Sequence, residues 1–344
     1  MKKIILSPSH TTIEIEDNET VLSGLERHGF VLPNNCRAGA CGECKVKVLD
    51  GNFDQGFILD MALKAEERAC GMGLMCMAKV TSESLTIDFQ KDNVLSKLPT
   101  PKENLPYVVT EKLMMTETIV KLRLKPLKDT LRFWPGQYIT LGSPEHKIPL
   151  RAYSLANIPT QEGELVLYIT KVNRGVTSNY IHQELNCGDT LTLNGPYGTF
   201  IGDPRLELPV LCIANGSGLA PIMSLATAAL MRGGFKYPAH IIFSARTSQD
   251  IFDLGHFKFL EKKYRNFKFI PTLTGETNPA FKAGRVTTLL PTLYPDLAYY
   301  AIYIAGSSEF VRDVKALALS LGAKEENIYL ESFLSQDLPL LPDQ

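Results

Sequence analysis

The spacing of four cysteines constrains this chain more than any other feature of its sequence. Cys36, Cys41 and Cys44 form a C-x4-C-x2-C run, and 31 residues separate Cys44 from Cys76. This spacing is typical of four thiolates that hold a [2Fe–2S] cluster. A structural zinc site usually joins two C-x2-C knuckles, whereas only one x2 spacing occurs here. We therefore predict that Cys36, Cys41, Cys44 and Cys76 bind a two-iron cluster, with zinc or simply packed thiols as the alternatives.

Two glycines in the same loop agree with this interpretation. Gly39 and Gly42 would let a short loop wrap a cluster and direct backbone N–H groups at its sulfurs, which influences the reduction potential. The chain has seven cysteines and no secretory signal, so we do not expect disulfides. Cys187 and Cys212 lie in turn or apolar contexts and are expected to be bystanders.

Composition excludes several classes of protein. Hydrophobic residues make up 44% and charged residues 21%, an ordinary balance for a soluble globular chain. The net charge of −1 argues against a nucleic-acid partner. No apolar run reaches the ~18 residues that a membrane span needs, and the N-terminus lacks the apolar core of a signal peptide. We expect a soluble, cytoplasmic protein without a membrane partner.

Charge and periodicity divide the chain into three units. Residues 1–92 hold 10 Lys/Arg and 14 Asp/Glu, a net of −4, and the Pro-rich residues 93–106 are typical of a linker. Closely spaced β-like runs in 107–205 predict a small antiparallel barrel. From 206 to 333, apolar strands alternate with helices, which predicts a parallel sheet with ligands at the carboxyl ends of its strands.

The barrel region contains a candidate flavin site. Tyr153 can flank an isoalloxazine ring, and Arg151 can neutralise a pyrophosphate. The helix that Gly175 begins can offer backbone N–H groups to the same anion. Each feature alone is equally compatible with an ordinary barrel.

A candidate nucleotide turn follows the apolar strand 210–214. Gly216 and Gly218 would let a pyrophosphate approach the backbone, and Pro221 suits the first turn of the next helix. The third glycine of the usual dinucleotide fingerprint is missing. A purely structural β-to-α turn is the alternative.

Taken together and in this order, the motifs resemble one family. The chain carries the cysteine run, Arg-x-Tyr-Ser, Gly-Val-x-Ser-Asn, Gly-Pro-Tyr-Gly, Gly-Ser-Gly-Leu-Ala-Pro and a late Glu-Ser-Phe, which span residues 36 to 333. This arrangement is similar to the ferredoxin–NADP reductase superfamily, in the branch with an N-terminal [2Fe–2S] ferredoxin module. That branch includes reductase components of bacterial oxygenases, of the phenol hydroxylase type, and the reductase of CDP-deoxysugar synthesis.

The resemblance implies a multidomain α+β and α/β fold. It implies a β-grasp ferredoxin module (1–92), a linker (93–106), a six-stranded antiparallel flavin-binding barrel (107–205), a Rossmann-like NAD(P)-binding domain (206–333) and a C-terminal extension (334–344). It makes Cys76 the fourth ligand rather than Cys70. The cofactor contacts that it implies are Arg151, Tyr153 and Ser154 for FAD; Gly175, Val176, Thr177 and Ser178 for its pyrophosphate; Gly216, Gly218 and Pro221 for the nicotinamide nucleotide; Phe333 beside the flavin; and Glu331 beside the nicotinamide. Ser154, Glu331 and Phe333 would be the catalytic residues.

Two departures concern the nicotinamide side. Many relatives have Cys-Gly where this chain has Ala305-Gly306, and eleven residues follow the usual terminal aromatic. NADPH-preferring relatives commonly have Ser-Arg at the end of the third strand, where this chain has a carboxylate, Glu276. Because an unpaired carboxylate would repel a 2′-phosphate, NADH is favoured, although Arg246 could still serve NADPH.

These features predict an electron-transfer enzyme. NADH would deliver a hydride to FAD, and the [2Fe–2S] cluster would pass single electrons to an external protein. The leading acceptor is an oxygenase component or an oxygenase-linked ferredoxin. The enzymatic alternative is a reductase of CDP-6-deoxyhexose synthesis, which would serve a deoxysugar dehydrase. A redox sensor or electron carrier without NAD(P)H turnover is the alternative from another class.

Overall fold

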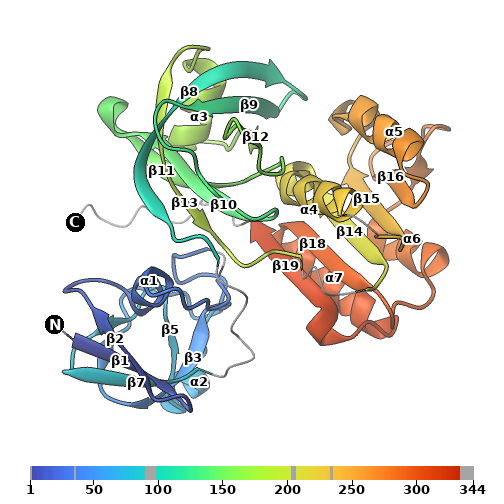
Figure 1. Cartoon of the computed structure of the whole chain (residues 1–344). Helices are drawn as coiled ribbons and strands as arrows, with labels where there is room; N and C mark the ends of the chain where they lie inside the picture. Colours follow the sequence, from blue (N-terminus) through green and yellow to red (C-terminus); the bar gives the residue numbers. More distant parts are fainter. Residues whose placement is uncertain (1, 35, 90–97, 203–206, 233–234, 334–344) are drawn as a thin grey trace. The chain divides into compact units, whose positions relative to one another are not determined.

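The structure, a computed structural model, describes residues 2–34, 36–89, 98–202, 207–232 and 235–333 (Figure 1). The chain divides into two compact units. The first comprises Met1–Lys102 with Gly195–Thr199, and the second comprises Glu103–Asn194 with Phe200–Gln344. Residues 93–97 of the expected linker and the expected C-terminal extension lie outside the described residues.

The first unit is a mixed five-stranded sheet with a short helix. Its strand order is β2-β1-β7-β3-β5, and β1 pairs with β7 in parallel and with β2 antiparallel. A second, two-stranded sheet joins β4 and β6. The elements are β1 (Lys2–Ser7), β2 (Thr11–Ile15), α1 (Val21–Arg27), β3 (Lys45–Asp50), β4 (Phe53–Asp54), α2 (Ala65–Ala69), β5 (Met72–Leu74), β6 (Lys79–Val80) and β7 (Ser84–Asp88).

Sequence signals explain why these elements form. Thr20 is the N-cap of α1, and its hydroxyl accepts a hydrogen bond from the backbone N–H of Ser23 at 3.3 Å. Val21, Leu22 and Leu25 of this helix are buried, at the spacing of one helical face. The core of the unit joins this face to alternate residues of β1 and β7.

The second unit begins with a six-stranded barrel in the order β11-β10-β13-β8-β9-β12. A bridge between Leu155 and Leu167 links the two ends of this order. The described β8/β9, β9/β12 and β10/β11 pairings are antiparallel. The elements are β8 (Lys102–Met114), β9 (Ile119–Pro126), β10 (Tyr138–Ser143), β11 (Ile148–Ser154), β12 (Leu165–Thr170), α3 (Val176–Gln183) and β13 (Thr190–Tyr197).

Strand β8 differs from the sequence expectation. It starts at Lys102, inside the segment expected to be a linker, although Pro106 lies within it. Leu105, Tyr107 and Val109 are buried, so the alternation of buried side chains that is typical of a strand already occurs in the Pro-rich stretch.

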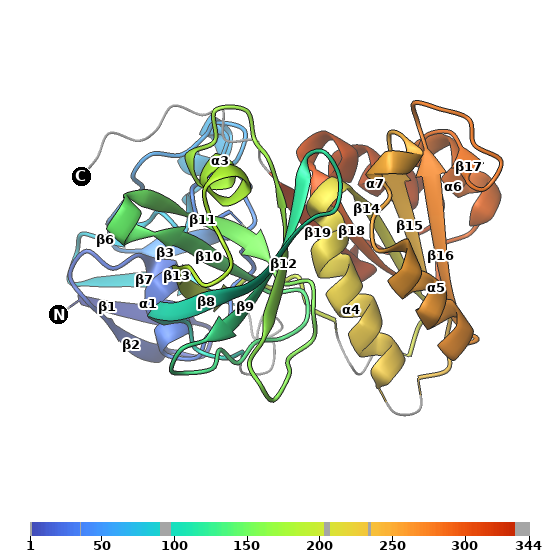
Figure 2. The ribbon, with the colours of Figure 1, turned by 90° about the horizontal axis from the view of Figure 1, so that it is seen from above.

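The rest of the second unit is a parallel sheet between two layers of helices (Figure 2). Its order is β17-β16-β15-β14-β18-β19. One face of the sheet packs on α4 and α5, and the other packs on α6 and α7. The elements are β14 (Val210–Asn215), α4 (Leu219–Met231), β15 (Ala239–Ala245), α5 (Leu254–Lys263), β16 (Phe267–Leu273), β17 (Lys282–Ala283), α6 (Val286–Leu293), β18 (Ala301–Ser307), α7 (Ser308–Ser320) and β19 (Ile328–Phe333).

The predicted fold class is confirmed, but helix α6 was not anticipated from the sequence. Pro291 lies inside this short helix, where a proline normally argues against helical structure. Burial of Val286 and Leu290 in the core beneath α7 outweighs that preference.

The barrel core contains one polar contact whose loss should be measurable. Tyr107 is fully buried, and its hydroxyl accepts a hydrogen bond from the backbone N–H of Leu131 at 2.9 Å. We expect Tyr107→Phe to lower the free energy of unfolding by about 1–3 kcal/mol, because the buried N–H is left without a partner. Guanidinium unfolding followed by Trp134, the single tryptophan, reports on the barrel. Tyr299→Phe, at a 71% exposed position, is the control, and equal midpoints for both variants would contradict the assignment.

Candidate functional site

The four predicted cluster ligands lie as two pairs. A thiol–thiol hydrogen bond joins Cys36 to Cys41, and another joins Cys44 to Cys76. The first pair is partly exposed and the second is buried. The backbone N–H of Cys76 also donates to Cys44 Sγ at 3.4 Å. The second pair therefore connects the cysteine loop to the turn after β5.

The pairing of the thiols bears on the kind of metal site that they can form. Within the described residues, no three His, Cys, Asp or Glu side chains converge as ligands of a single metal ion. A structural zinc ion needs four ligands around one centre, whereas a [2Fe–2S] cluster shares four cysteines between two irons. Two pairs of thiols are compatible with the two-iron cluster, in which each iron takes two cysteines.

Hydrogen bonds in the cysteine loop favour the thiolate form of Cys36. The thiol of Cys41 lowers the pKa of Cys36 to about 5 by donating a hydrogen bond. Backbone N–H groups of Ala38, Ala40 and Cys41 also donate to Cys36 Sγ, at 3.4, 3.3 and 3.3 Å. A hydrogen bond from Cys44 likewise lowers the pKa of Cys76. Donors that favour a thiolate also suit sulfur bound to iron.

Glycine is required at two positions of this loop. Gly39 and Gly42 have φ angles of +67° and +81°, in the left-handed region. A Cβ would lie 2.9 Å from the Phe57 carbonyl oxygen at position 39, and 2.9 Å from the Ala62 carbonyl oxygen at position 42. The segment from Phe57 to Ala62 thus packs directly against the cysteine loop.

The predicted flavin residues lie on strand β11. Arg151 and Tyr153 share one face of the strand and are partly buried, whereas the buried Ser154 is on the other face. Burial raises the pKa of Tyr153, so its phenol stays neutral. A partly buried aromatic ring next to a cation is compatible with a flavin and its pyrophosphate.

The hydroxyls of two predicted pyrophosphate-binding residues of helix α3 bond to the backbone. The Thr177 hydroxyl donates to the Pro149 carbonyl at 2.7 Å, and the Ser178 hydroxyl accepts from the Val172 N–H at 3.1 Å. Thr177 therefore ties the helix to strand β11, and Ser178 ties it to the loop before the helix. Gly175 is the N-cap, and the N–H groups of the first turn are the donors that a helix leaves for an anion.

The nucleotide turn is pressed against strand β18. A Cβ at Gly218 would lie 2.4 Å from the Ala305 carbonyl oxygen, so no side chain fits there. Asn215 Oδ1 accepts the Ser307 N–H at 3.1 Å. Gly216 has a φ of +53° and is exposed. Pro221 lies buried in the first turn of α4, as predicted from the turn chemistry.

Polar contacts inside the second unit hold this turn against the barrel. The Thr170 hydroxyl at the end of β12 donates to Ser217 Oγ at 2.9 Å. The Ser224 hydroxyl of α4 donates to the Asn157 carbonyl at 2.8 Å. The nucleotide turn therefore bonds to β12, and helix α4 bonds to the loop that follows β11.

The most informative contact joins Ser154 to Glu331. The Ser154 hydroxyl donates to Glu331 Oε1 at 2.8 Å, and the two residues are only 8% and 2% exposed. Glu331 Oε2 is buried and has no hydrogen-bond partner among the described residues. Burial raises the pKa of Glu331 to about 8, so the carboxyl is protonated at neutral pH. Phe333, two residues later on β19, is partly buried on the same side of the strand.

The residues predicted to select the coenzyme, Arg246 and Glu276, follow the carboxyl ends of β15 and β16. Backbone bonds from Thr274 to Ala245 and from Gly275 to Arg246 hold the two ends together. The Ser248 N–H donates to Glu276 at 2.9 Å, and contact with Ser248 lowers the pKa of Glu276. Arg246 is exposed.

Two side-chain contacts were not predicted from the sequence. The Ser154–Glu331 bond joins residues 177 positions apart, and no local pattern signals it. Glu26 on α1 forms a two-pronged ion pair with Arg37, next to Cys36, with N–O distances of 2.7 and 2.9 Å. Only the presence of an arginine inside the cysteine run could have suggested that pair.

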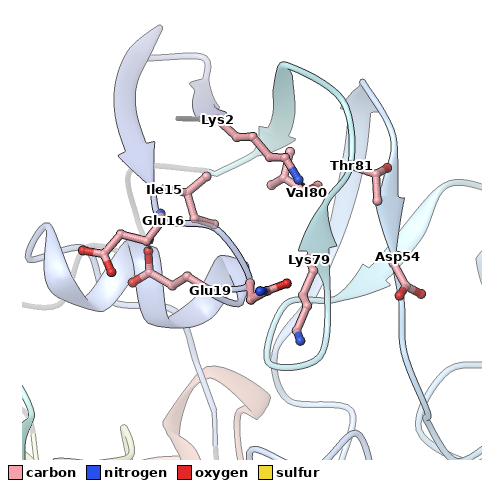
Figure 3. A pocket seen from close by; sticks show the side chains of 9 residues that line it. Lys2, Ile15, Glu16, Glu19, Asp54, Lys79, Val80 and Thr81 are labelled. Carbon is pink, nitrogen blue, oxygen red and sulfur yellow. Dashed lines mark hydrogen bonds between the residues drawn. The ribbon is translucent and has the colours of Figure 1, made fainter.

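One further hollow lies away from the predicted residues (Figure 3). It has a volume of about 140 Å³, and charged side chains of both signs line it, including Glu16, Glu19 and Lys79. Lys2 donates to the Val80 carbonyl across it. None of the predicted site residues lines this hollow. Across the residues described, no helix has both the length and the apolar character to cross a membrane.

Three family models match successive parts of the chain. A 2Fe-2S iron-sulfur cluster binding domain matches residues 4–81. An oxidoreductase FAD-binding domain matches residues 97–201, and an oxidoreductase NAD-binding domain matches residues 212–316.

Curated relatives match over most of their length. The ferredoxin–NAD(P)+ reductase component of the naphthalene 1,2-dioxygenase/salicylate 5-hydroxylase systems of Ralstonia sp. is 30% identical, over 96% of this chain and 98% of the relative. The phenol hydroxylase P5 protein of Acinetobacter pittii is 34% identical, over 79% and 76%. The crystal structure of the Amycolatopsis cytochrome P450 reductase GcoB superposes with a TM-score of 0.88 at 27% identity, over 97% and 99% of the two chains.

The paired cysteines, the barrel and the nucleotide turn thus agree with the matched models in type and order. The chain belongs to the ferredoxin–NADP reductase-like iron–sulfur flavoproteins with an N-terminal ferredoxin domain, the reductase components that transfer electrons from NAD(P)H through FAD and a [2Fe–2S] cluster to oxygenases.

Proposed function

We propose that this reductase uses NADH and that its acceptor is the oxygenase component of one multicomponent system, or a ferredoxin linked to it. Full-length similarity to reductases of dioxygenase and monooxygenase systems supports the acceptor class. The observation that carries the catalytic part is the buried Ser154–Glu331 hydrogen bond. It joins the candidate flavin strand to the edge of the nucleotide-binding sheet.

We assign the cluster to Cys36, Cys41, Cys44 and Cys76, with two cysteines on each iron. The two thiol pairs and the N–H donors around Cys36 support this assignment. Bound flavin supplies the chemistry that accepts a hydride and releases electrons singly. The cluster domain spans approximately residues 1–92, and the domains for FAD and nucleotide follow it.

The barrel residues bind and orient the flavin. Tyr153 would flank its ring and Arg151 would neutralise its pyrophosphate, together with the first-turn N–H groups of Val176, Thr177 and Ser178. The hydroxyls of Thr177 and Ser178 act indirectly, because they bond the helix start to β11 and to the preceding loop. Ser154 would lie near the reacting edge of the ring because it contacts Glu331.

The nucleotide side completes the site. Gly216 and Gly218 allow the coenzyme pyrophosphate to approach the turn, and Pro221 fixes the start of α4. Glu331 holds a proton on a buried carboxyl whose Oε2 has no partner among the described residues. Phe333, next to it on β19, would shield the flavin ring from water.

The first test is spectroscopic. The purified, anaerobic protein should show flavin absorption over a broad cluster envelope, and NADH should bleach both, because the two centres exchange electrons. Cys76→Ser should remove the cluster envelope while the flavin is still bleached. Cys70→Ser, at an exposed cysteine outside the assigned set, is the control. A protein without flavin, or one that neither NADH nor NADPH bleaches, would overturn the proposal.

The second test concerns Glu331. Its pKa of about 8 lies above the ordinary value, so the group is neutral below that pH and ionises above it. We expect flavin reduction by saturating NADH to slow as pH rises through about 8, because a buried anion opposes the negative charge arriving on the flavin.

Stopped-flow measurements between pH 6 and pH 9.5 would show this inflection. Glu331→Gln should abolish it, since the amide stays neutral and can still accept from Ser154. Glu326→Gln, on an exposed turn, should retain the inflection. An unchanged inflection in Glu331→Gln would exclude Glu331 as its source.

The third test concerns coenzyme choice. The hydrogen bond from Ser248 keeps Glu276 ionised, and this charge should repel the 2′-phosphate of NADPH. We expect Glu276→Gln to raise kcat/KM for NADPH by about tenfold with little change for NADH. Arg246→Ala tests the competing role of the neighbouring cation. A wild-type preference for NADPH, lost in Arg246→Ala, would reverse the assignment.

A further inference from the structure

The residue after the first cluster ligand has an unusual backbone. Arg37 has a φ of +52°, in the left-handed region that non-glycine residues rarely adopt. Such a conformation persists only where the surrounding structure imposes it. Because Arg37 directly follows Cys36, whatever holds Arg37 also sets the shape of the cysteine loop.

Glu26 holds the arginine from one side. Both carboxylate oxygens accept from Arg37 Nη1, at 2.7 and 2.9 Å. Arg37 Nη2 also donates to Ser23 Oγ at 3.3 Å, one turn earlier on α1. The two side chains of the ion pair are only 20% and 14% exposed, so water screens the interaction weakly.

Tyr197 holds it from another side. The guanidinium carbon of Arg37 lies 4.3 Å from the centre of the Tyr197 ring, within the range of a cation–π contact. Tyr197 is buried and belongs to Gly195–Thr199, the short segment that groups with the cysteine-containing unit. In the same unit, the Asn34 N–H donates to Thr199 Oγ1 at 3.4 Å.

The consequence falls on Cys36. Once the chain turns back at Arg37, the N–H groups of Ala38, Ala40 and Cys41 all donate to Cys36 Sγ. Hydrogen bonds to cluster sulfurs, together with nearby charge, set the reduction potential of an iron–sulfur centre. An arginine clamp beside Cys36 therefore bears on electron transfer as well as on folding.

We propose that Arg37 is a positioning residue held by Glu26 and Tyr197, and we call these contacts the Arg37 clamp. The clamp sets the reduction potential of the cluster. The inference rests on the proposed function in one respect, the assignment of Cys36 as a cluster ligand. A role confined to folding would change stability and leave the potential of the assembled cluster unaltered.

The test is a redox titration of the full-length protein, followed by the electron paramagnetic resonance signal of the reduced cluster. Arg37→Met should shift the midpoint potential to more negative values, because it removes a cation and loosens the N–H donors. Arg37→Lys should fall between this variant and wild type, since lysine keeps the charge but lacks the second nitrogen that donates to Ser23 and the planar group over Tyr197. Arg27→Met is the matched control, because Arg27, the last residue of α1, forms an ion pair with Glu19, which precedes the helix.

Variants of Tyr197 keep the proposal testable if Arg37→Met assembles no cluster. Tyr197→Leu should also make the midpoint potential of the cluster more negative. Tyr197→Phe should keep the wild-type potential, because it retains the aromatic ring that contacts Arg37. Potentials in Arg37→Lys and Tyr197→Leu equal to those of wild type and Arg27→Met would overturn the clamp. A wild-type protein without a reduced-cluster signal would instead overturn the cluster assignment.

Discussion

The hydrogen bond between Ser154 and Glu331 is the constraint on which the proposed catalytic site depends. Ser154 ends a barrel strand, and Glu331 lies on the edge strand of the parallel sheet. The bond keeps a protonated carboxyl in a dry environment, where an ionised carboxylate would be costly. Thr170 and Ser224 add hydrogen bonds between the barrel and the parallel-sheet part of the second unit. These bonds hold the barrel and the nucleotide turn together.

The parts of the fold and site that local sequence specifies were predictable. The cysteine spacing, the glycine turn before α4 and the alternation of strands and helices each depend on residues close in sequence, and comparison bears out the family and cofactor classes that they indicated. Strand β8 and helix α6 were missed because burial outweighed the proline signals of Pro106 and Pro291.

The contacts that tune the site were not predictable in the same way. Glu26 and Arg37 lie 11 positions apart on a helix and a loop, and Ser154 and Glu331 meet only when two layers assemble. The flavin loop shows the same limit at a finer scale. Its sequence suggested that the start of α3 holds a pyrophosphate, but no local pattern indicated that the hydroxyls of Thr177 and Ser178 bond to backbone groups, which leaves the helix N–H groups for an anion.

The grouping of Gly195–Thr199 with the cysteine-containing unit has a consequence for how such a module can be exchanged between proteins. A ferredoxin unit cut out at the Pro-rich stretch would leave behind the tyrosine that contacts Arg37. If two related genes were recombined at the Pro-rich stretch, the cysteine loop of one protein would lie against residues 195–199 of the other. A chimera would therefore need a matching tyrosine from the barrel sequence, so the two halves of the gene are constrained to change together.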